Sequence, residues 1–123
     1  MVATVVVGAL AFAACGGGDD DDAGGGYVEP KGPATETVTV KAGNIFFDPE
    51  TVTAAAGVTK LTLQGIAGGH TLVFDDAYPG FQLEISGDST DAKKIDLKPG
   101  KYTYYCDVLG HRAAGMEGTL TVK

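Results

Sequence analysis

"GKYTYYCDVLGHRAAGMEGTLTVK" occupies residues 100–123 and contains two patterns that together decide the fold. Apolar and polar residues alternate in "KYTYYC" and again in "GTLTVK", a period of two that is typical of half-buried β-strands. The turn-rich stretch between them contains Cys106, His111 and Met116, each five residues after the last. The sequence therefore predicts two strands joined by a loop that is rich in side chains able to bind metals.

The same alternation recurs upstream. Five further segments carry it: "ETVTVKAG" at 36–43, "ETVTAAAG" at 50–57, "TKLTLQG" at 59–65, "HTLVFDD" at 70–76 and "KKIDLKPG" at 93–100. Gly, Pro or Asp residues separate these segments, and no stretch shows a long helical period. Seven short alternating segments predict an all-β fold, an antiparallel Greek-key β-sandwich or barrel. Residues 75–91 fit neither pattern, and we expect a loop there with a short strand or a turn of helix.

The alternation also places two polar side chains. His70 begins a segment on the face of Leu72 and Phe74, and Cys106 ends a segment on the face of Tyr104. If both faces point inward, the His70 imidazole and the Cys106 thiol lie at the same end of the sandwich.

The chain of 123 residues is acidic, with 16 acidic and 9 basic residues and a net charge of −7. This balance argues against nucleic-acid binding, which needs a basic surface. Five of the acids precede residue 35, so 35–123 carries eleven acids and eight bases, a net charge of −3. The predicted folded part is therefore only mildly acidic.

Residues 2–14, "VATVVVGALAFAA", form an apolar run shorter than the ~20 residues that span a bilayer. Its length is that of a signal-peptide core. The run ends in "FAAC", which resembles the lipobox of bacterial lipoproteins, although no Lys or Arg precedes Cys15 and Phe12 stands where Leu is common. The resemblance implies a signal peptide at 1–14, lipidation of Cys15, and anchoring to the outer, periplasmic or extracellular, face of the bacterial membrane. A plain secretory signal with a chance Cys is the alternative.

Gly and Asp dominate the segment after Cys15. Gly-rich sequence is flexible and four consecutive Asp residues repel one another, so we expect 15–34 to form a flexible tether without a core. The folded domain is then 35–123. An acylated Cys15 cannot pair with Cys106, whereas an exported chain without acylation leaves a disulfide between the two open.

The predicted domain contains few residues that bind soft metals. Cys106 is its only Cys and Met116 its only Met, and it contains both His residues of the chain, His70 and His111. Each alone has an ordinary explanation, because a single His usually lies at the surface or satisfied in a core and a single Met usually fills space. Gathered by one strand and one loop, the four indicate a metal site.

A thiolate, two imidazoles and a weak thioether are the ligand set of copper sites that transfer electrons. Zinc would accept one Cys and two His residues but has little use for Met116. A Cys–His nucleophile with Asp107 as its orienting group would leave His70 and Met116 unexplained. We expect one copper ion, Cu(I)/Cu(II), and no enzyme, because four ligands leave no open position for a substrate.

The segment at 100–123 resembles the C-terminal copper loop of the cupredoxins, the blue copper proteins of the plastocyanin and azurin type. The upstream segments "NIFFDPETVTAAAG", "TKLTLQG" and "GGHTLVF" are similar to the first half of the same domain, so the resemblance covers 35–123. It implies that His70, Cys106 and His111 are the strong equatorial ligands of a type 1 (blue) copper site and that Met116 is the axial ligand.

This chain differs from most cupredoxins of this type in two respects. Its Cys-to-His spacing is longer than in most plastocyanins and closer to the lengths found in azurin or rusticyanin. Many cupredoxins follow the first His with Asn, whose hydrogen bonds join the two ligand loops, whereas Thr71 makes fewer such bonds and so alters the surroundings of the metal. Gly69 precedes His70, and in azurin-like sites a Gly carbonyl at that place approaches the metal.

The resemblance also implies that one edge of His111 reaches the surface. Leu109, Ala113 and Ala114 would form a small apolar rim around it, on which a redox partner docks. The mild acidity of the domain suggests a partner with a basic surface, such as a c-type cytochrome or an oxidase domain. We therefore expect a monomeric, membrane-tethered copper protein that carries single electrons between membrane or periplasmic redox partners.

Two other functions stay open at this point. The same ligands would serve a copper-binding or copper-delivery module without an electron-transfer partner, and a copper-free cupredoxin-like domain would serve adhesion or assembly. A visible spectrum with copper distinguishes the copper-free domain, and retention of copper during redox cycling distinguishes a carrier from a donor.

Overall fold

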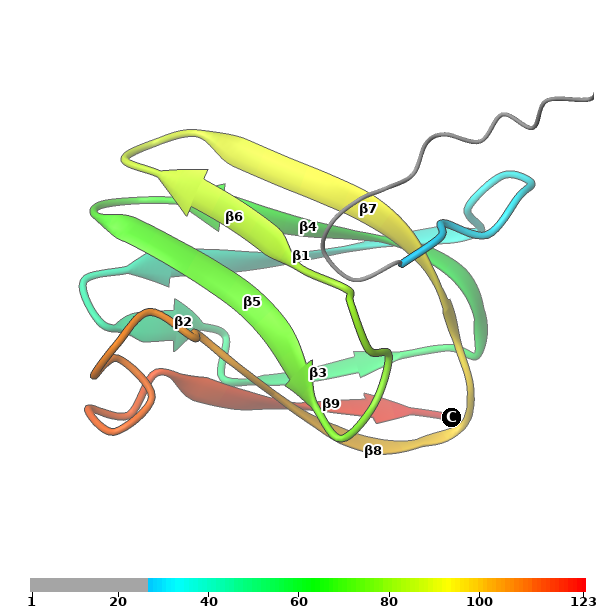
Figure 1. Cartoon of the computed structure of the whole chain (residues 1–123). Coiled ribbons are helices and arrows are strands. Elements are labelled where there is room, and N and C mark those ends of the chain that lie inside the picture. The colour runs from blue at the N-terminus through cyan, green and yellow to red at the C-terminus, as the bar shows by residue number, and fades with distance from the viewer. Residues whose placement is uncertain (1–26) are drawn as a thin grey trace, which may run out of the picture.

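The computed structural model describes residues 27–123, which form nine β-strands and, within that range, no α-helix. The strands are β1 (Glu36–Gly43), β2 (Phe46–Asp48), β3 (Thr51–Ala54), β4 (Gly57–Gly65), β5 (Gly69–Asp75), β6 (Leu83–Ser86), β7 (Thr90–Leu97), β8 (Gly100–Tyr105) and β9 (Glu117–Val122). They form a four-stranded sheet in the order β2-β1-β4-β7 and a five-stranded sheet in the order β3-β9-β8-β5-β6 (Figure 1). The two sheets enclose a common core, and the predicted all-β fold is confirmed.

All seven alternating segments form strands, and the structure adds two more. β2 follows a turn in which Ile45 has a φ of 62°, and at three residues it is too short for its alternation to be recognised. β6 lies inside the segment 75–91, which lacks a clear pattern, and it buries Leu83 and Ile85. The rest of that segment is the last residue of β5, the turns at 76–82 and 87–89, and the start of β7.

Not every pair of neighbouring strands is antiparallel, which corrects the predicted pairing. β1 runs parallel to β4, and β3 runs parallel to β9. The chain passes from the four-stranded sheet to the five-stranded sheet between β2 and β3 and returns at β4, which brings strands of the same direction side by side. Alternation predicts which side chains face inward but not which strands become neighbours.

The inward-facing side chains of both sheets form one core, as the alternation predicts. Its most deeply buried aliphatic side chains are Val40, Leu63, Leu72, Leu83, Ile95, Leu97 and Leu120. Phe74 of β5 packs against Tyr78 and Tyr104, with ring centroids 5.3 and 6.4 Å away. Burial of this apolar surface is the main driving force of the fold, and it holds β5 against β8.

Residues 27–34, the last part of the predicted tether, lie against the domain. The Tyr27 hydroxyl donates a hydrogen bond to the Lys94 carbonyl at 2.6 Å, and the Lys94 N–H donates to Glu29 Oε1 at 2.7 Å. The Tyr27 ring packs edge-on against Phe81 at 5.1 Å, and burial raises the pKa of Tyr27 to about 12. Residues 27–34 are therefore held against β7 of the domain.

The predicted signal peptide at 1–14 and the predicted lipidation site at Cys15 lie outside the described residues. Within 27–123, no helix has the length and apolar character needed to cross a membrane. Export and lipidation therefore stay predictions.

Thr59 in β4 contains the one buried side-chain oxygen in residues 27–123 that lacks a hydrogen-bond partner. An unpaired buried hydroxyl costs about 1–3 kcal/mol. We expect Thr59→Val to raise the free energy of unfolding by about 1 kcal/mol, because Val has nearly the same shape and removes the hydroxyl. Chemical denaturation measures this, with Thr62→Val, a half-buried position on the same strand, as the control. A destabilised Thr59→Val variant would contradict the expectation.

Candidate metal centre

The four predicted ligands come from the end of the sandwich where the β4–β5 and β8–β9 loops meet, on the left in Figure 1. His70 is the second residue of β5, Cys106 directly follows β8, Met116 directly precedes β9, and His111 lies in the loop between them. The ligand atoms of His70, Cys106 and His111 all lie within 4.8 Å of one another. The prediction that His70 and Cys106 lie at the same end of the sandwich is therefore confirmed, and His111 lies there with them.

The imidazoles and the thiol face one another closely. Nδ1 of His70 lies 3.3 Å from Nδ1 of His111, which in turn lies 3.4 Å from Sγ of Cys106. Cys106 is a free, fully buried thiol, and His70 is buried as well, while His111 is partly exposed. A buried thiol between two imidazoles is a set of donors that suits a soft transition-metal ion, so these residues fit copper.

Met116 is fully buried and is tied through its backbone to two of the other predicted ligands. Its carbonyl accepts a hydrogen bond from the Cys106 N–H at 3.1 Å, and its N–H donates to the His111 carbonyl at 3.1 Å. These bonds close the loop between β8 and β9 and hold Met116 at the same end of the domain as the three converging side chains. Its role as axial ligand stays a prediction.

The β4–β5 loop orients the His70 ring. Nε2 of His70 lies 2.8 Å from the Ala67 carbonyl oxygen, to which its N–H donates, and this leaves the Nδ1 lone pair free to face the site. Gly68 has a φ of 81°, and a Cβ there would lie 3.0 Å from Nε2 of His70. An added Cβ at Gly69 would meet nothing within 4 Å, and the approach of the Gly69 carbonyl to the metal stays a prediction. The pair "GG" before His70 is the signal that could have led to Gly68.

Thr71, predicted to lie beside the metal, bonds both to the thiol and to the residue after it. The Thr71 N–H donates to Sγ of Cys106 at 3.4 Å. Oγ1 of Thr71 lies 2.6 Å from Oδ1 of Asp107, to which it donates, and accepts from the Asp107 N–H at 2.9 Å. Thr71 therefore joins the two ligand segments with Asp107 as its partner, a role that the sequence did not reveal for this carboxylate.

Arg112 braces the ligand loop against the five-stranded sheet. Its guanidinium donates to Oδ2 of Asp75 at 2.8 Å and to Oε2 of Glu117 at 2.8 Å, and it stacks over the Tyr105 ring at 4.0 Å. Hydrogen bonds to Asp75 and then to Glu117 raise the pKa of Arg112. Because these three partners belong to β5, β9 and β8, one side chain connects the loop to all three strands that border the ligands.

The residues of the predicted apolar rim lie at the surface. Leu109 is 97% exposed, and Ala113 and Ala114 are exposed in the same loop as the partly exposed His111. Ile66 of the β4–β5 loop, which the sequence did not single out, is 50% exposed. The metal end of the domain therefore presents apolar side chains from both the β4–β5 loop and the β8–β9 loop.

Known copper proteins resemble this chain in sequence. The family model described as copper binding proteins, plastocyanin/azurin family, matches residues 34–123. The chain belongs to the plastocyanin/azurin family. A plastocyanin from Dryopteris crassirhizoma is 36% identical over 98 residues, which cover 68% of this chain and 93% of that protein. A plastocyanin from a Synechococcus species is 34% identical over 104 residues, which cover 72% of this chain and 75% of that protein.

The fold of this family member also has solved counterparts. The structure of auracyanin B superimposes with a TM-score of 0.67 at 23% identity and covers 81% of this chain and 96% of its own. This likeness confirms the predicted cupredoxin fold. Family membership and the converging His70, Cys106 and His111 together identify a mononuclear type 1 copper protein that carries electrons between redox proteins, with one copper ion as its cofactor.

Proposed function

We propose that this cupredoxin is a membrane-tethered carrier that takes up and passes on single electrons at the exposed edge of His111. The observation that carries the proposal is the uneven exposure of the ligand set. Cys106 and Met116 are fully buried and His70 is 2% exposed, whereas His111 is partly exposed. Among these four side chains, His111 is therefore the one that a docked redox protein can approach.

The proposed ligands are His70, Cys106, His111 and, as a weak axial ligand, Met116. A copper ion bound by such a set supplies a one-electron Cu(I)/Cu(II) couple. The surrounding residues keep the donors in place: the Ala67 carbonyl holds His70, Thr71 bonds the thiol, and Arg112 braces the loop. Ligands held in this way rearrange little when the charge of the bound ion changes, which favours electron transfer over catalysis on a substrate.

The apolar rim is the proposed docking surface. Leu109, Ala113 and Ala114 are exposed in the same loop as His111, and a surface of small and aliphatic side chains lets a partner approach closely while it excludes water. Residues 35–123 carry a net charge of −3, which favours a partner with a basic surface, such as a c-type cytochrome or an oxidase domain.

The tether would keep the carrier close to its partners. We propose that the exported chain is processed before Cys15 and lipidated there, on the basis of the apolar run, "FAAC" and the Gly/Asp-rich sequence that follows. Confinement to a membrane surface raises the effective concentration of redox complexes in the same membrane. The bonds of Tyr27 and Glu29 to β7 support a tether that joins the domain on that side.

The structure favours electron transfer over the other two functions. A copper donor needs ligands that a recipient protein can reach, but Cys106 and Met116 are fully buried. A copper-free interaction domain has no use for a free, buried thiol that faces two imidazoles. Both features agree with an ion that stays in place.

Addition of Cu(II) is expected to produce an intense blue or green thiolate-to-copper band. Cys106→Ser should abolish the band because it removes the thiolate, whereas Met116→Ala should keep the colour and shift the reduction potential. Visible spectroscopy and voltammetry measure these effects. After reduction and reoxidation in the presence of a copper chelator, the band of a carrier should return in full, whereas that of a donor should stay bleached. A colourless protein, or one that takes up only zinc, would rule out the proposed site.

Leu109→Ser is expected to lower the second-order rate of electron transfer to a basic c-type cytochrome roughly tenfold, because the docked complex loses the burial of one aliphatic side chain. Stopped-flow mixing measures the rate. Val28→Ser is the matched control, since Val28 is 82% exposed and lies outside the ligand loops. Equal effects of the two variants would argue against docking on the rim.

Cys15→Ser is expected to move the protein from the membrane fraction to the soluble exported fraction, because it removes the site of acylation. Cell fractionation with mass spectrometry of the mature N-terminus measures both location and lipid. Gly16→Ala is the control and should stay in the membrane fraction. Retention of Cys15→Ser on the membrane without a lipid would refute the anchor.

A further inference from the structure

One hydroxyl hydrogen beside the thiol ligand has two acceptors within reach. Oγ1 of Thr71 lies 2.6 Å from Oδ1 of Asp107 and 3.7 Å from Sγ of Cys106. A threonine hydroxyl donates a single hydrogen, so the two acceptors compete for it. The contact with Asp107 has the length of a charge-assisted O–H···O bond, whereas the contact with sulfur is long. The hydrogen therefore lies toward the carboxylate.

A second bond holds the hydroxyl in that orientation. The Asp107 N–H donates to Oγ1 of Thr71 at 2.9 Å and occupies one of its lone pairs. Thr71 and Asp107 thus form a reciprocal pair of hydrogen bonds, which we call the Thr71–Asp107 clasp. Within this clasp, Sγ of Cys106 keeps the backbone N–H of Thr71 as a donor at 3.4 Å but does not receive the hydroxyl hydrogen.

We infer that Asp107 is a positioning residue that withholds the Thr71 hydroxyl from the Cys106 sulfur and thereby keeps the reduction potential of the copper site low. The inference rests on the proposed function. A hydrogen bond to a thiolate ligand withdraws electron density from it, which favours Cu(I) over Cu(II) and raises the potential. Hydrogen bonding around the Cys sulfur is one of the ways in which a protein tunes such sites.

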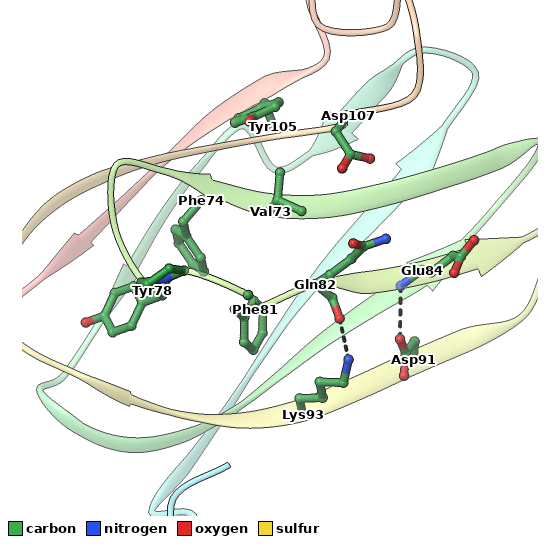
Figure 2. A pocket seen from close by; sticks show the side chains of 12 residues that line it. Val73, Phe74, Tyr78, Phe81, Gln82, Glu84, Asp91, Lys93, Tyr105 and Asp107 are labelled. Carbon is green, nitrogen blue, oxygen red and sulfur yellow. Dashed lines mark hydrogen bonds between the residues drawn. The ribbon is translucent and has the colours of Figure 1, made fainter. Parts of the chain in front are cut away.

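The clasp connects a buried atom to the surface. Thr71 is 5% exposed, whereas Asp107 is exposed at the rim of an open groove of about 540 Å³ lined by residues of β5, β6, β7 and β8. Figure 2 shows Asp107 on one side of this groove and Glu84 on the other. A surface carboxylate can in this way act on a fully buried sulfur through the single side chain of Thr71.

Loss of a negative charge near the metal would also raise the potential, so the test has to separate the charge of Asp107 from its hold on the hydroxyl. Two features of the chain allow this. Thr71→Val removes the hydroxyl, after which a change at Asp107 acts through its charge alone. Glu84→Gln is the matched control. Glu84 pairs with Thr71 across β5 and β6, and the substitution removes a neighbouring carboxylate that is not part of the clasp.

The experiment is a double-mutant cycle on the copper-loaded full chain, with Asp107→Ala, Thr71→Val, the double variant and Glu84→Gln. We expect Asp107→Ala to shift the Cu(I)/Cu(II) equilibrium about tenfold toward Cu(I), or about 59 mV for a one-electron couple, together with a shift of the thiolate-to-copper band. In the Thr71→Val background the same change should give only the shift of Glu84→Gln. Asp107→Asn, which keeps an acceptor oxygen, should restore most of the original potential. Thr71→Ala also lacks the hydroxyl and replaces Thr71→Val if that variant does not fold.

A second measurement uses the metal-free protein. The clasp should appear there as non-additive losses of stability for the Thr71 and Asp107 variants in chemical denaturation. Non-additive stability with additive shifts in potential would make the clasp purely structural and overturn the inference. A copper-loaded protein with its blue band but additive shifts overturns the inference alone, whereas the absence of the band in the unaltered protein overturns the proposed function as well.

Discussion

The metal centre depends on the contact between β5 and β8, where the Thr71 N–H meets the sulfur of Cys106. The antiparallel register pairs Val73 with Tyr105 and Phe74 with Tyr104. Continued by two residues, the same register sets Thr71 opposite Asp107, just beyond the end of β8. At that point, hydrogen bonds of the Thr71 side chain replace those of the backbone ladder. They hold Thr71, which follows His70, against Asp107, which follows Cys106.

The other supports of the site converge on this junction from different elements. The Ala67 carbonyl turns His70 toward the thiol, and the backbone bonds of Met116 draw the far end of the ligand loop back to Cys106. Arg112 adds a bridge to Asp75 and Glu117. Exposed ion pairs are individually weak, but this one is combined with stacking on Tyr105 and acts on a loop already closed by hydrogen bonds. Together these contacts hold the segments that contain His70, Cys106, His111 and Met116 at one end of the domain.

Much of the fold and of the candidate metal centre could be predicted from residue patterns. The period of two identified seven strands and their inward faces, because half-buried strands need apolar side chains on alternate positions. The predicted ligands stood out because the domain has one Cys, one Met and two His. The pattern failed where strands were short, as in β2, and where partners were distant, as in the parallel pair of β1 and β4. The place of Gly68 beside His70 was not recognised, because the pair of glycines marks a turn but does not tell which of the two has a positive φ.

The sequence by itself determined the all-β class and the end of the sandwich where His70, Cys106 and His111 meet, and it predicted the set of metal ligands. These follow from local alternation and from residue types that have few other uses in a small domain. Only the tertiary structure decided which groups surround the ligands. Thr71 and Asp107 are 36 positions apart, and Arg112 and Asp75 are 37 apart. Such pairs form because core packing sets the register between β5 and β8, and that register is a property of both strands together rather than of either segment alone.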